Sequence, residues 1–308
     1  MTAGAALPRV TAVGACHPDR KARAAAPFVR GASNPVELRS CPGGVARNVA
    51  DNLARLGLRA ALVSRLGRDA EGEALLPGLE ALPLDLAGVT RSETAPSAFH
   101  LIALEPDGEM LVAVADMRIY DEMTPALLQG LPGALWDVDA LFADCNLPAE
   151  TLGWLAARRS DSRPFAVNGV SPAKARRLRD HLGACDLLFV NRGEAAALLG
   201  GVESAPEALA AALAAAGAGE AVVTLGAAGI AVAKGKETLM LPTVEGRIVD
   251  ITGAGDALAA AYLEARLRGV DCEGAARRAL AAARLTVACA ESVSPDLSPA
   301  TLDRMVTA

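Results

Sequence analysis

Short apolar runs that alternate with longer stretches of helical periodicity constrain the fold of this chain more than any other feature. Such alternation is typical of an α/β protein with a mainly parallel sheet and helices on both faces, a three-layer α/β/α sandwich. The apolar or β-branched runs predict strands at residues 10–13, 60–64, 140–143, 165–167, 187–190, 221–225 and 229–233. Apolar residues at helical spacing predict helices at residues 46–56, 149–157, 172–182, 194–199, 206–216 and 256–267.

Two segments, at about 16–40 and 97–118, break this rhythm. The second contains AFHLIALEPDGEMLVAVA, which is typical of a hairpin that turns at residues 105–108. We expect both segments to supply strands to a small antiparallel lid outside the main sheet. Because the edges and apolar faces of such a lid are exposed in a single copy, we expect a homodimer through the lid. No internal repeat or long linker interrupts the chain, which predicts one domain over residues 1–308.

Composition narrows the classes of protein and partner. The chain has 308 residues, of which 52% are hydrophobic, enough to bury a large core. Its net charge is −6 and its basic residues are scattered, which argues against a nucleic acid polymer as partner. Six widely separated cysteines form no C-x-x-C pair, so we expect free thiols. Because neither a signal peptide nor a spanning stretch is recognisable, we expect a cytoplasmic protein without a membrane partner.

The segment GRIVDITGAGDALAAAYLEARLRG, residues 246–269, carries the strongest chemical signal. A strand-like run ends there in a glycine-rich turn that opens directly into an alanine-rich helix. The N–H groups of Gly253, Ala254 and Gly255 would lie at the helix N-terminus, where unpaired donors and the helix dipole favour phosphate. Asp256 would repel phosphate, but it suits a base that takes a proton from an attacking hydroxyl. The alternative is that Asp256 only caps the helix.

DITGAGD, residues 250–256, resembles the D-T-x-G-A-G-D signature of the ribokinase-like (PfkB-type) carbohydrate kinases, with Ile251 in place of the usual threonine. Five further segments resemble the same family in the same order along the chain. The resemblance implies a kinase that uses ATP and Mg²⁺ to phosphorylate a small sugar or nucleoside. It also implies that Asp256 is the general base, that residues 253–255 form the anion site, and that Asp250 is a candidate ligand of an activating K⁺.

Two of the matching segments would build the sugar site. VGACHPD ends at Asp19, which by resemblance binds sugar hydroxyls; the alternative is an exposed aspartate in a turn. PGGVARN contains Gly43 and Gly44, which would let the backbone approach the sugar, and Asn48, which would offer it a donor and an acceptor. SRLGRDAEG, residues 64–72, matches a family stretch that we interpret as structural, shaping a turn and capping a helix.

The other two segments would build the nucleotide site. VNRGE resembles the family's N-x-x-E pattern, which implies that Asn191 and Glu194 help place Mg²⁺ and the ATP phosphates, with the metal held partly through water. A capping box between the same two residues is a compatible alternative. TLGAAG resembles the T-x-G-x-x-G turn that lies along the nucleotide, which implies ATP-binding roles for Thr224, Gly226 and Gly229.

Further details resemble one branch of the family, the bacterial pseudouridine kinases. They are SNP at 33–35, GGVARN at 43–48, VAVADMRIYDEMTP at 112–125 and CNLPAETL at 145–152. This branch implies transfer to the 5′-hydroxyl of pseudouridine, with Asn34, Asp116 and Met117 as candidates for recognition of the base. The alternative for Asp116 is a plain turn after a strand. One departure is that Asn168 and Gly169 stand where the branch tends to carry Asp-Pro.

Two alternative functions stay open. The first keeps the enzyme class and makes the acceptor ribose, fructose or a purine nucleoside, although Val45 replaces the lysine of ribokinase and counts against ribose. The second is a non-catalytic sensor that binds a sugar or nucleoside, which the intact Asp256 argues against. A nicotinamide-dependent dehydrogenase is excluded more firmly, because no G-x-G-x-x-G follows the first strand.

Overall fold

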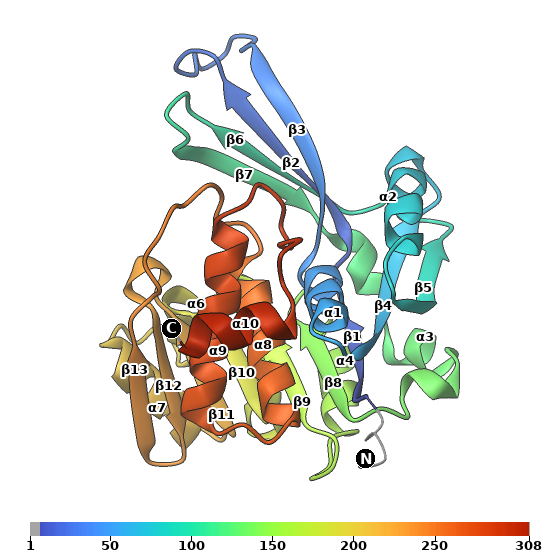
Figure 1. Cartoon of the computed structure of the whole chain (residues 1–308). Coiled ribbons are helices and arrows are strands. Elements are labelled where there is room, and N and C mark those ends of the chain that lie inside the picture. The colour runs from blue at the N-terminus through green and yellow to red at the C-terminus, as the bar shows by residue number, and fades with distance from the viewer. Residues whose placement is uncertain (1–6, 308) are drawn as a thin grey trace.

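The computed structural model of this protein describes residues 7–307 and centres on a nine-stranded sheet, ordered β13-β12-β11-β10-β9-β8-β1-β4-β5 (Figure 1). Its strands are β1 (Arg9–Val13), β4 (Arg59–Gly67), β5 (Asp85–Ser92), β8 (Ala140–Asp144), β9 (Phe165–Asn168), β10 (Leu187–Asn191), β11 (Glu220–Thr224), β12 (Ile230–Lys234) and β13 (Glu237–Leu241). Neighbours pair in parallel except at β11–β12 and β12–β13. The mainly parallel sheet is confirmed, and every predicted strand overlaps an observed one.

Two strands, β5 and β13, are missing from the sequence prediction. Each lies at an edge of the sheet, where one side needs no partner and exposed polar residues are tolerated. β5 reads DLAGVTRS and β13 reads ETLML, so neither carries a long apolar run. Pattern reading finds the buried central strands and misses these edges for that reason.

Helices cover both faces of the sheet, each over its own apolar core. Successive strand residues face opposite sides, so Val10 and Ala12 pack in one core while Val13 packs in the other. One face carries α1 (Val45–Arg55), α2 (Ala70–Glu80), α8 (Ala254–Leu267), α9 (Cys272–Val287) and α10 (Pro299–Thr307). The other carries α3 (Pro125–Gln129), α4 (Ala149–Ala156), α5 (Pro172–Ala175), α6 (Arg192–Leu198) and α7 (Pro206–Ala215). The predicted three-layer sandwich is confirmed.

The prediction for residues 172–182 needs correction. Helix α5 ends after one turn, and a 3₁₀ helix, η3 (Arg176–Ala184), follows it. Leu178 and Leu182 are buried in this arrangement. Because both would also be buried on an α-helix, their spacing alone does not distinguish the two windings.

Alanine allows α8 to pack closely against its neighbours α1 and α9. Ala257 and the run Ala259, Ala260 and Ala261 are fully buried, and a methyl group is all that separates the backbone of α8 from the next layer there. The helix therefore has a fixed position in the layer. Its N-terminus, which carries the candidate catalytic residues, is fixed with it.

A second sheet, which we call the lid, stands on the body and projects from it (Figure 1). It consists of β2 (His17–Ala24), β3 (Val36–Gly43), β6 (Phe99–Leu104) and β7 (Met110–Asp116), in the order β3-β2-β6-β7. The predicted hairpin is confirmed as β6–β7, closed by a hydrogen bond from the Glu105 amide to the Glu109 carbonyl at 2.8 Å. The lid is not wholly antiparallel, because its central pair β2–β6 is parallel.

The expectation of free thiols is confirmed for all six cysteines, three of which are buried. Within residues 7–307, no helix combines the length and apolar composition that crossing a bilayer requires.

Candidate active site

The polar residues of the site lie where parallel strands end. Asp144 and Asn168 are partners in the register of β8 and β9, and Asn191 and Thr224 are partners in that of β10 and β11. Parallel strands direct their carboxyl ends to one edge of the sheet, and ligands of such folds bind beyond that edge. The register therefore brings together residues that are far apart in the sequence.

The turn before α8 requires its first glycine. Gly253 has φ of 81°, and a Cβ on it would lie 1.9 Å from the Ser292 carbonyl oxygen. Gly255 differs, because a Cβ there would meet no heavy atom within 4 Å. The Ala254 amide donates to the Ile251 carbonyl at 3.3 Å, so it is not free to bind phosphate in this conformation. Gly255 and Asp256 lie in the first turn of α8, where amides lack an intrahelical partner.

Asp256 is a buried carboxyl with a pKa near neutrality. It is 9% exposed, and its Oδ2 accepts a hydrogen bond from Asn48 Nδ2 at 2.8 Å. Burial raises the pKa of Asp256 to about 7; the carboxylates of Asp144 and Asp19 act in the same direction, against the Asn48 hydrogen bond and the Arg47 charge. A carboxyl that titrates near pH 7 suits a general base better than one that is fully ionised.

Arg47, which the sequence analysis did not select, orients the partner of Asp256. Its Nη1 donates to Asn48 Oδ1 at 3.0 Å, and its Nη2 lies 3.1 Å from Asp51 Oδ2. The Asn48 amide is thereby turned so that its nitrogen faces Asp256. Asn48 was expected to bind sugar with both atoms, but both are engaged by protein. The signal was available, since Asp51 follows Arg47 at the i,i+4 spacing of an ion pair on a helix.

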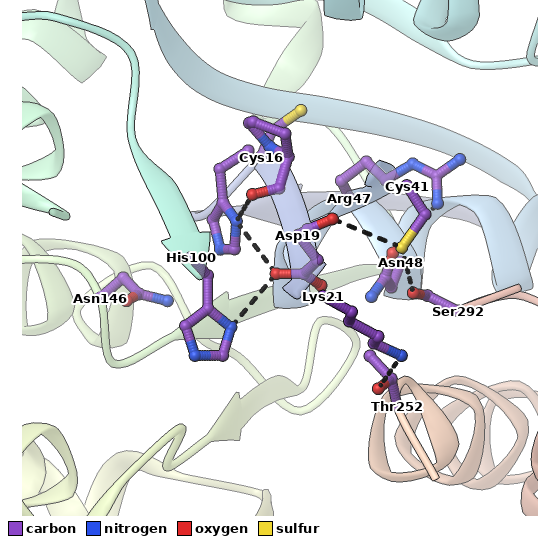
Figure 2. Close-up of polar contacts among 12 residues, drawn as sticks. Cys16, Asp19, Lys21, Cys41, Arg47, Asn48, His100, Asn146, Thr252 and Ser292 are labelled. Carbon is purple, nitrogen blue, oxygen red and sulfur yellow. Dashed lines mark hydrogen bonds and ion pairs between the residues drawn. The ribbon is translucent and has the colours of Figure 1, made fainter. Parts of the chain in front are cut away.

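Asp19 lies on lid strand β2 and is only 5% exposed, which excludes the alternative of an exposed turn residue. Its Oδ1 is 3.4 Å from His17 Nδ1 and 3.3 Å from His100 Nδ1 (Figure 2). Burial lowers the pKa of His17, so this ring is neutral near pH 7. His100 is a further candidate that sequence reasoning missed, because a lone histidine in a strand carries no motif. It enters the site from β6, and it is partly exposed.

The glycine pair serves the protein itself. A Cβ on Gly43 would lie 2.2 Å from Asp19 Oδ2, and one on Gly44, where φ is 96°, would lie 2.4 Å from the Ala15 carbonyl oxygen. Gly43 therefore leaves room for the Asp19 carboxylate, and Gly44 lets the start of α1 approach the end of β1. The expected approach of these glycines to a sugar stays a prediction.

Asn191 and Glu194 form the capping box of α6. Asn191 Oδ1 accepts from the Glu194 amide at 2.9 Å, and Glu194 Oε2 accepts from the Asn191 amide at 3.0 Å. Glu194 is 4% exposed, and burial raises its pKa. Among residues 7–307, no group of three or more His, Cys, Asp or Glu residues could hold a metal ion. One carboxylate already engaged in this way fits an ion held through water but not a direct protein cage.

The Asn168-Gly169 departure has a structural consequence beside Glu194. A Cβ on Gly169 would lie 2.8 Å from Glu194 Oε2, so the glycine gives this carboxylate its space. Asn168 Oδ1 accepts from the Val170 amide at 2.9 Å and stabilises an unusual loop. Val170 has φ of 66°, a left-handed conformation that is strained for a β-branched residue.

In the turn after β11, one of the two predicted glycines is needed for the fold and the other has open space beside it. A Cβ on Gly229, where φ is 102°, would lie 2.0 Å from the Leu241 carbonyl oxygen, so this glycine is needed for the β11–β12 turn. Gly226 has open space beside it. Thr224 is half-buried, with its hydroxyl 3.5 Å from the Val190 carbonyl oxygen.

The three lid residues proposed to recognise a base are not brought together. Asn34 uses its side chain to fold its own loop, accepting from the Val29 amide at 2.7 Å and donating to the Val29 carbonyl at 3.1 Å. Asp116 binds Arg118 Nε at 2.9 Å, and this contact lowers the pKa of Asp116 to about 2. Met117 packs against the apolar core. For Asp116 the geometry agrees with the plain turn weighed as its alternative.

Asp250 does not present a free carboxylate. Its Oδ1 accepts from the Thr252 amide at 2.9 Å, and its Oδ2 accepts from the Lys21 ammonium. Burial alone would raise its pKa, but the hydrogen bonds from Lys21 and Thr252 outweigh burial and hold the pKa below its usual value. The expected K⁺ ligand is therefore already occupied by a cation of the protein.

An amide-bearing helix N-terminus beside a buried near-neutral carboxyl, with a polar lid opposite, defines a site for phosphoryl transfer to a hydroxyl. Residues 8–298 match the family model described as pfkB family carbohydrate kinase, so the chain belongs to that family. The protein is an ATP-dependent phosphotransferase that acts on a hydroxyl group of a sugar or nucleoside.

Three relatives illustrate the likeness. The pseudouridine kinase of Escherichia coli K12 is 31% identical over 281 residues, which cover 89% of this chain and 88% of that protein. The structure of a carbohydrate kinase from Agrobacterium tumefaciens is 32% identical, with a TM-score of 0.83 over 98% of this chain and 97% of the other. Arabidopsis thaliana ribokinase, solved with ribose and ATP, shares the fold with a TM-score of 0.82 at 20% identity, over 98% and 99% of the two chains.

Replacing the two glycines should separate folding from phosphate binding. Gly253→Ala should lower the free energy of unfolding by at least about 1–2 kcal/mol, because its Cβ would overlap the Ser292 carbonyl and its φ is positive. Gly255→Ala is the matched control, and should fold as well as the parent while losing kinase activity, because its methyl group enters the space open to phosphate. Thermal unfolding and initial rates measure the two effects. A fully active Gly255→Ala variant would contradict this use of the space.

The raised pKa of Asp256 should make the fold less stable as pH rises. The folded carboxyl binds a proton up to about pH 7, whereas an unfolded aspartate releases it near its usual pKa of about 3.9. Stability is therefore lost between these values and stays lost above them. Asp256→Asn should exceed the parent by about 1–4 kcal/mol at pH 8, and by much less at pH 5. Urea unfolding at both pH values measures this, with exposed Asp137→Asn as control; an equal gain at both would refute it.

Proposed function

We propose that this kinase phosphorylates the 5′-hydroxyl of a nucleoside, and that its acceptor is pseudouridine. The observation that carries the proposal is that the start of α1 connects the base Asp256 to the lid carboxylate Asp19: Asn48 donates to Asp256 at 2.8 Å, and a Cβ on Gly43, five residues earlier, would lie 2.2 Å from Asp19 Oδ2. A ribose held by Asp19 through its hydroxyls would present its remaining hydroxyl toward Asp256. The identity to a pseudouridine kinase over most of the chain supports pseudouridine as the nucleoside.

The proposed transfer uses Asp256 for the proton and α8 for the charge. The ionised Asp256 carboxylate accepts the proton of the acceptor hydroxyl as its oxygen bonds to the γ-phosphorus of ATP, while the bond from that phosphorus to the bridging oxygen breaks and ADP leaves. Asn48, held by Arg47, keeps the carboxylate aimed at the hydroxyl. The Gly255 amide and the dipole of α8 stabilise charge on the transferring group.

The nucleotide would lie against the ends of β10 and β11. Gly226 borders open space there and Thr224, at the end of β11, is half-buried beside it. Glu194 would hold Mg²⁺ through water, together with Asn191. When bound, Mg²⁺ supplies positive charge that offsets the phosphates. The chain's own contribution is to hold Glu194 at a helix N-terminus, with Gly169 leaving it room.

His100 is the side chain that we assign to the nucleobase. It is partly exposed and lies against Asp19 (Figure 2). An imidazole offers a donor or an acceptor to the polar edge of a uracil ring as well as an apolar face. Asn34, Asp116 and Met117 would need other rotamers to take part, because their present contacts lie within the lid or the core.

A panel of acceptors tests the substrate. Pseudouridine, uridine, ribose, fructose, inosine and adenosine are each offered with ATP, and the release of ADP is measured. Pseudouridine should have the highest kcat/KM, and His100→Ala should lower it for pseudouridine more than for ribose. If ribose reacts fastest and pseudouridine not at all, the acceptor is wrong, and a ribokinase activity like that of the Arabidopsis neighbour takes its place.

Asp256→Asn tests the mechanism. Removal of a general base should lower kcat by about 10²–10⁴-fold while the acceptor still binds. Because the base acts in its ionised form, kcat/KM of the parent should rise with pH and level off above a midpoint near 7. Turnover that the substitution leaves unchanged would remove Asp256 from this role, and binding without any turnover in the parent would favour the sensor.

We further propose that the lid pairs with a second copy of the chain. Asp19 and Lys21 face the site, so the alternate residues of β2, Ala22 among them, face away from it. Ala22 lies opposite Leu38 and Ala103, and Ala103 lies opposite Val112, so all of these share the outer face. Leu38 and Val112 are 57% and 50% exposed. An apolar sheet face is stable when another layer covers it, and the same face of a second lid would cover these residues.

The mass in solution tests this pairing. Leu38→Glu combined with Val112→Glu should convert a dimer into a monomer, because pairing would bring four carboxylates together in an apolar interface. Arg39→Ala, on the opposite face of the same strand, is the control and should leave the dimer intact. Light scattering coupled to size-exclusion chromatography measures the mass. A monomeric parent protein at micromolar concentration would contradict the proposal.

A further inference from the structure

Lys21 connects the lid to the loop that begins α8. It lies on the inner face of β2, two residues after Asp19, and its ammonium donates to the Asp250 carboxylate. It also donates to the Thr252 hydroxyl at 2.7 Å (Figure 2). The side chains of Lys21 and Asp250 are only 15% and 23% exposed. An ion pair this far from water is screened less than a surface pair. It joins residues that lie 229 positions apart in the chain.

The Asp250 carboxylate shapes the loop that Lys21 contacts. One of its oxygens accepts from the Thr252 amide, so the carboxylate folds the turn that leads into Gly253. The nearby Val287 carbonyl is engaged by the amides of Val249 at 2.7 Å and Asp250 at 3.3 Å. A K⁺ ion needs several oxygen ligands, and both oxygens of Asp250 and the Val287 carbonyl already accept hydrogen bonds from protein groups. It could bind to Asp250 only by displacing Lys21.

A second contact joins the lid to the loops around α8 at the same place. Cys41 of β3 lies 3.8 Å, Sγ to Oγ, from Ser292, whose carbonyl oxygen packs against Gly253. Cys41 and Asp19 are register partners across β3 and β2. Two neighbouring lid strands therefore rest on the segments that position the anion site, and Lys21 supplies the charged contact.

We propose that the Lys21 ammonium is the built-in monovalent cation of the anion site in the kinase proposed above, so that transfer needs no K⁺ but needs strand β2 seated on the α8 loop. An ammonium carries the same charge as K⁺ and donates up to three hydrogen bonds, two of which are in place. It neutralises Asp250, whose charge would otherwise repel the phosphate that approaches Gly255. Because Asp19 lies on the same strand, the acceptor site is complete only when this contact is made.

The test compares the parent with Lys21→Met, which keeps the length of the side chain and removes its charge. Arg23→Met is the control, since Arg23 lies on the same face of β2 and is exposed. Rates are measured at constant ionic strength in the chlorides of potassium, sodium and tetramethylammonium. The parent and Arg23→Met should change less than twofold among the salts. Lys21→Met should lose at least tenfold in tetramethylammonium chloride and recover at least threefold of its rate in potassium chloride.

Thermal unfolding in the same salts gives a readout that does not depend on catalysis. Lys21→Met should have a higher Tm in potassium than in tetramethylammonium chloride, because K⁺ can then bind to Asp250, whereas the parent should show no such difference. A parent that requires K⁺, or a Lys21→Met variant that K⁺ neither activates nor stabilises, would overturn the proposal. If Lys21→Met does not fold, the response of the parent decides. A parent inactive on every acceptor would refute the proposed function. The Tm comparison would still test whether the Lys21 ammonium takes the place of K⁺ beside Asp250.

Discussion

The buried carboxylate of Asp144 ties together the three chain segments that build the acceptor half of the site. It is fully buried, and it accepts hydrogen bonds from the amides of Ala15 at 2.8 Å, Ala46 at 3.1 Å and Asn146 at 2.9 Å. Ala15 lies just after β1, Ala46 lies in the first turn of α1 and Asn146 lies just after β8. One charged group, satisfied by backbone donors, thereby fixes the entry to the lid and the helix that carries Asn48. Its charge also raises the pKa of Asp256, so one residue contributes to both architecture and reactivity.

The fold and the order of the motifs were readable from the sequence because they depend on periodicity and on local turn chemistry. The central strands and the helices follow from apolar spacing, and Gly253 follows from a turn that only glycine allows. The edge strands β5 and β13 were not predicted because their exposed positions carry no apolar pattern. The parallel pairing of β2 with β6 was not predicted because the sequence of neither strand indicates which strand it pairs with.

The site was predicted as a set of residues rather than as a set of contacts. Asp256, Asp19 and Asn48 do gather at one place, but the side chain of Asn48 binds Asp256 and Arg47. The i,i+4 spacing indicates the Arg47–Asp51 ion pair but not the contact of Arg47 with Asn48. Asp250 was identified as a cation ligand, and its cation is a lysine brought from the lid by tertiary structure. Asn34 was expected to bind a ligand, but its side chain forms hydrogen bonds within its own loop. Residue type indicates what a side chain is able to do, and only packing decides which partner it finds.

The parallel β2–β6 pair also has a consequence for how the molecule assembles. Asp19 and His100 lie opposite each other in this pair, yet they are 81 residues apart in the chain. Strands β4 and β5 and helices α1 and α2 lie between them, and a parallel pair needs such a crossover. Closing so long a loop costs entropy that is recovered only when the intervening layer has formed. The lid is therefore two local hairpins, β2–β3 and β6–β7, whose junction depends on the first half of the body, so the Asp19–His100 pair is completed only when that half brings the hairpins together.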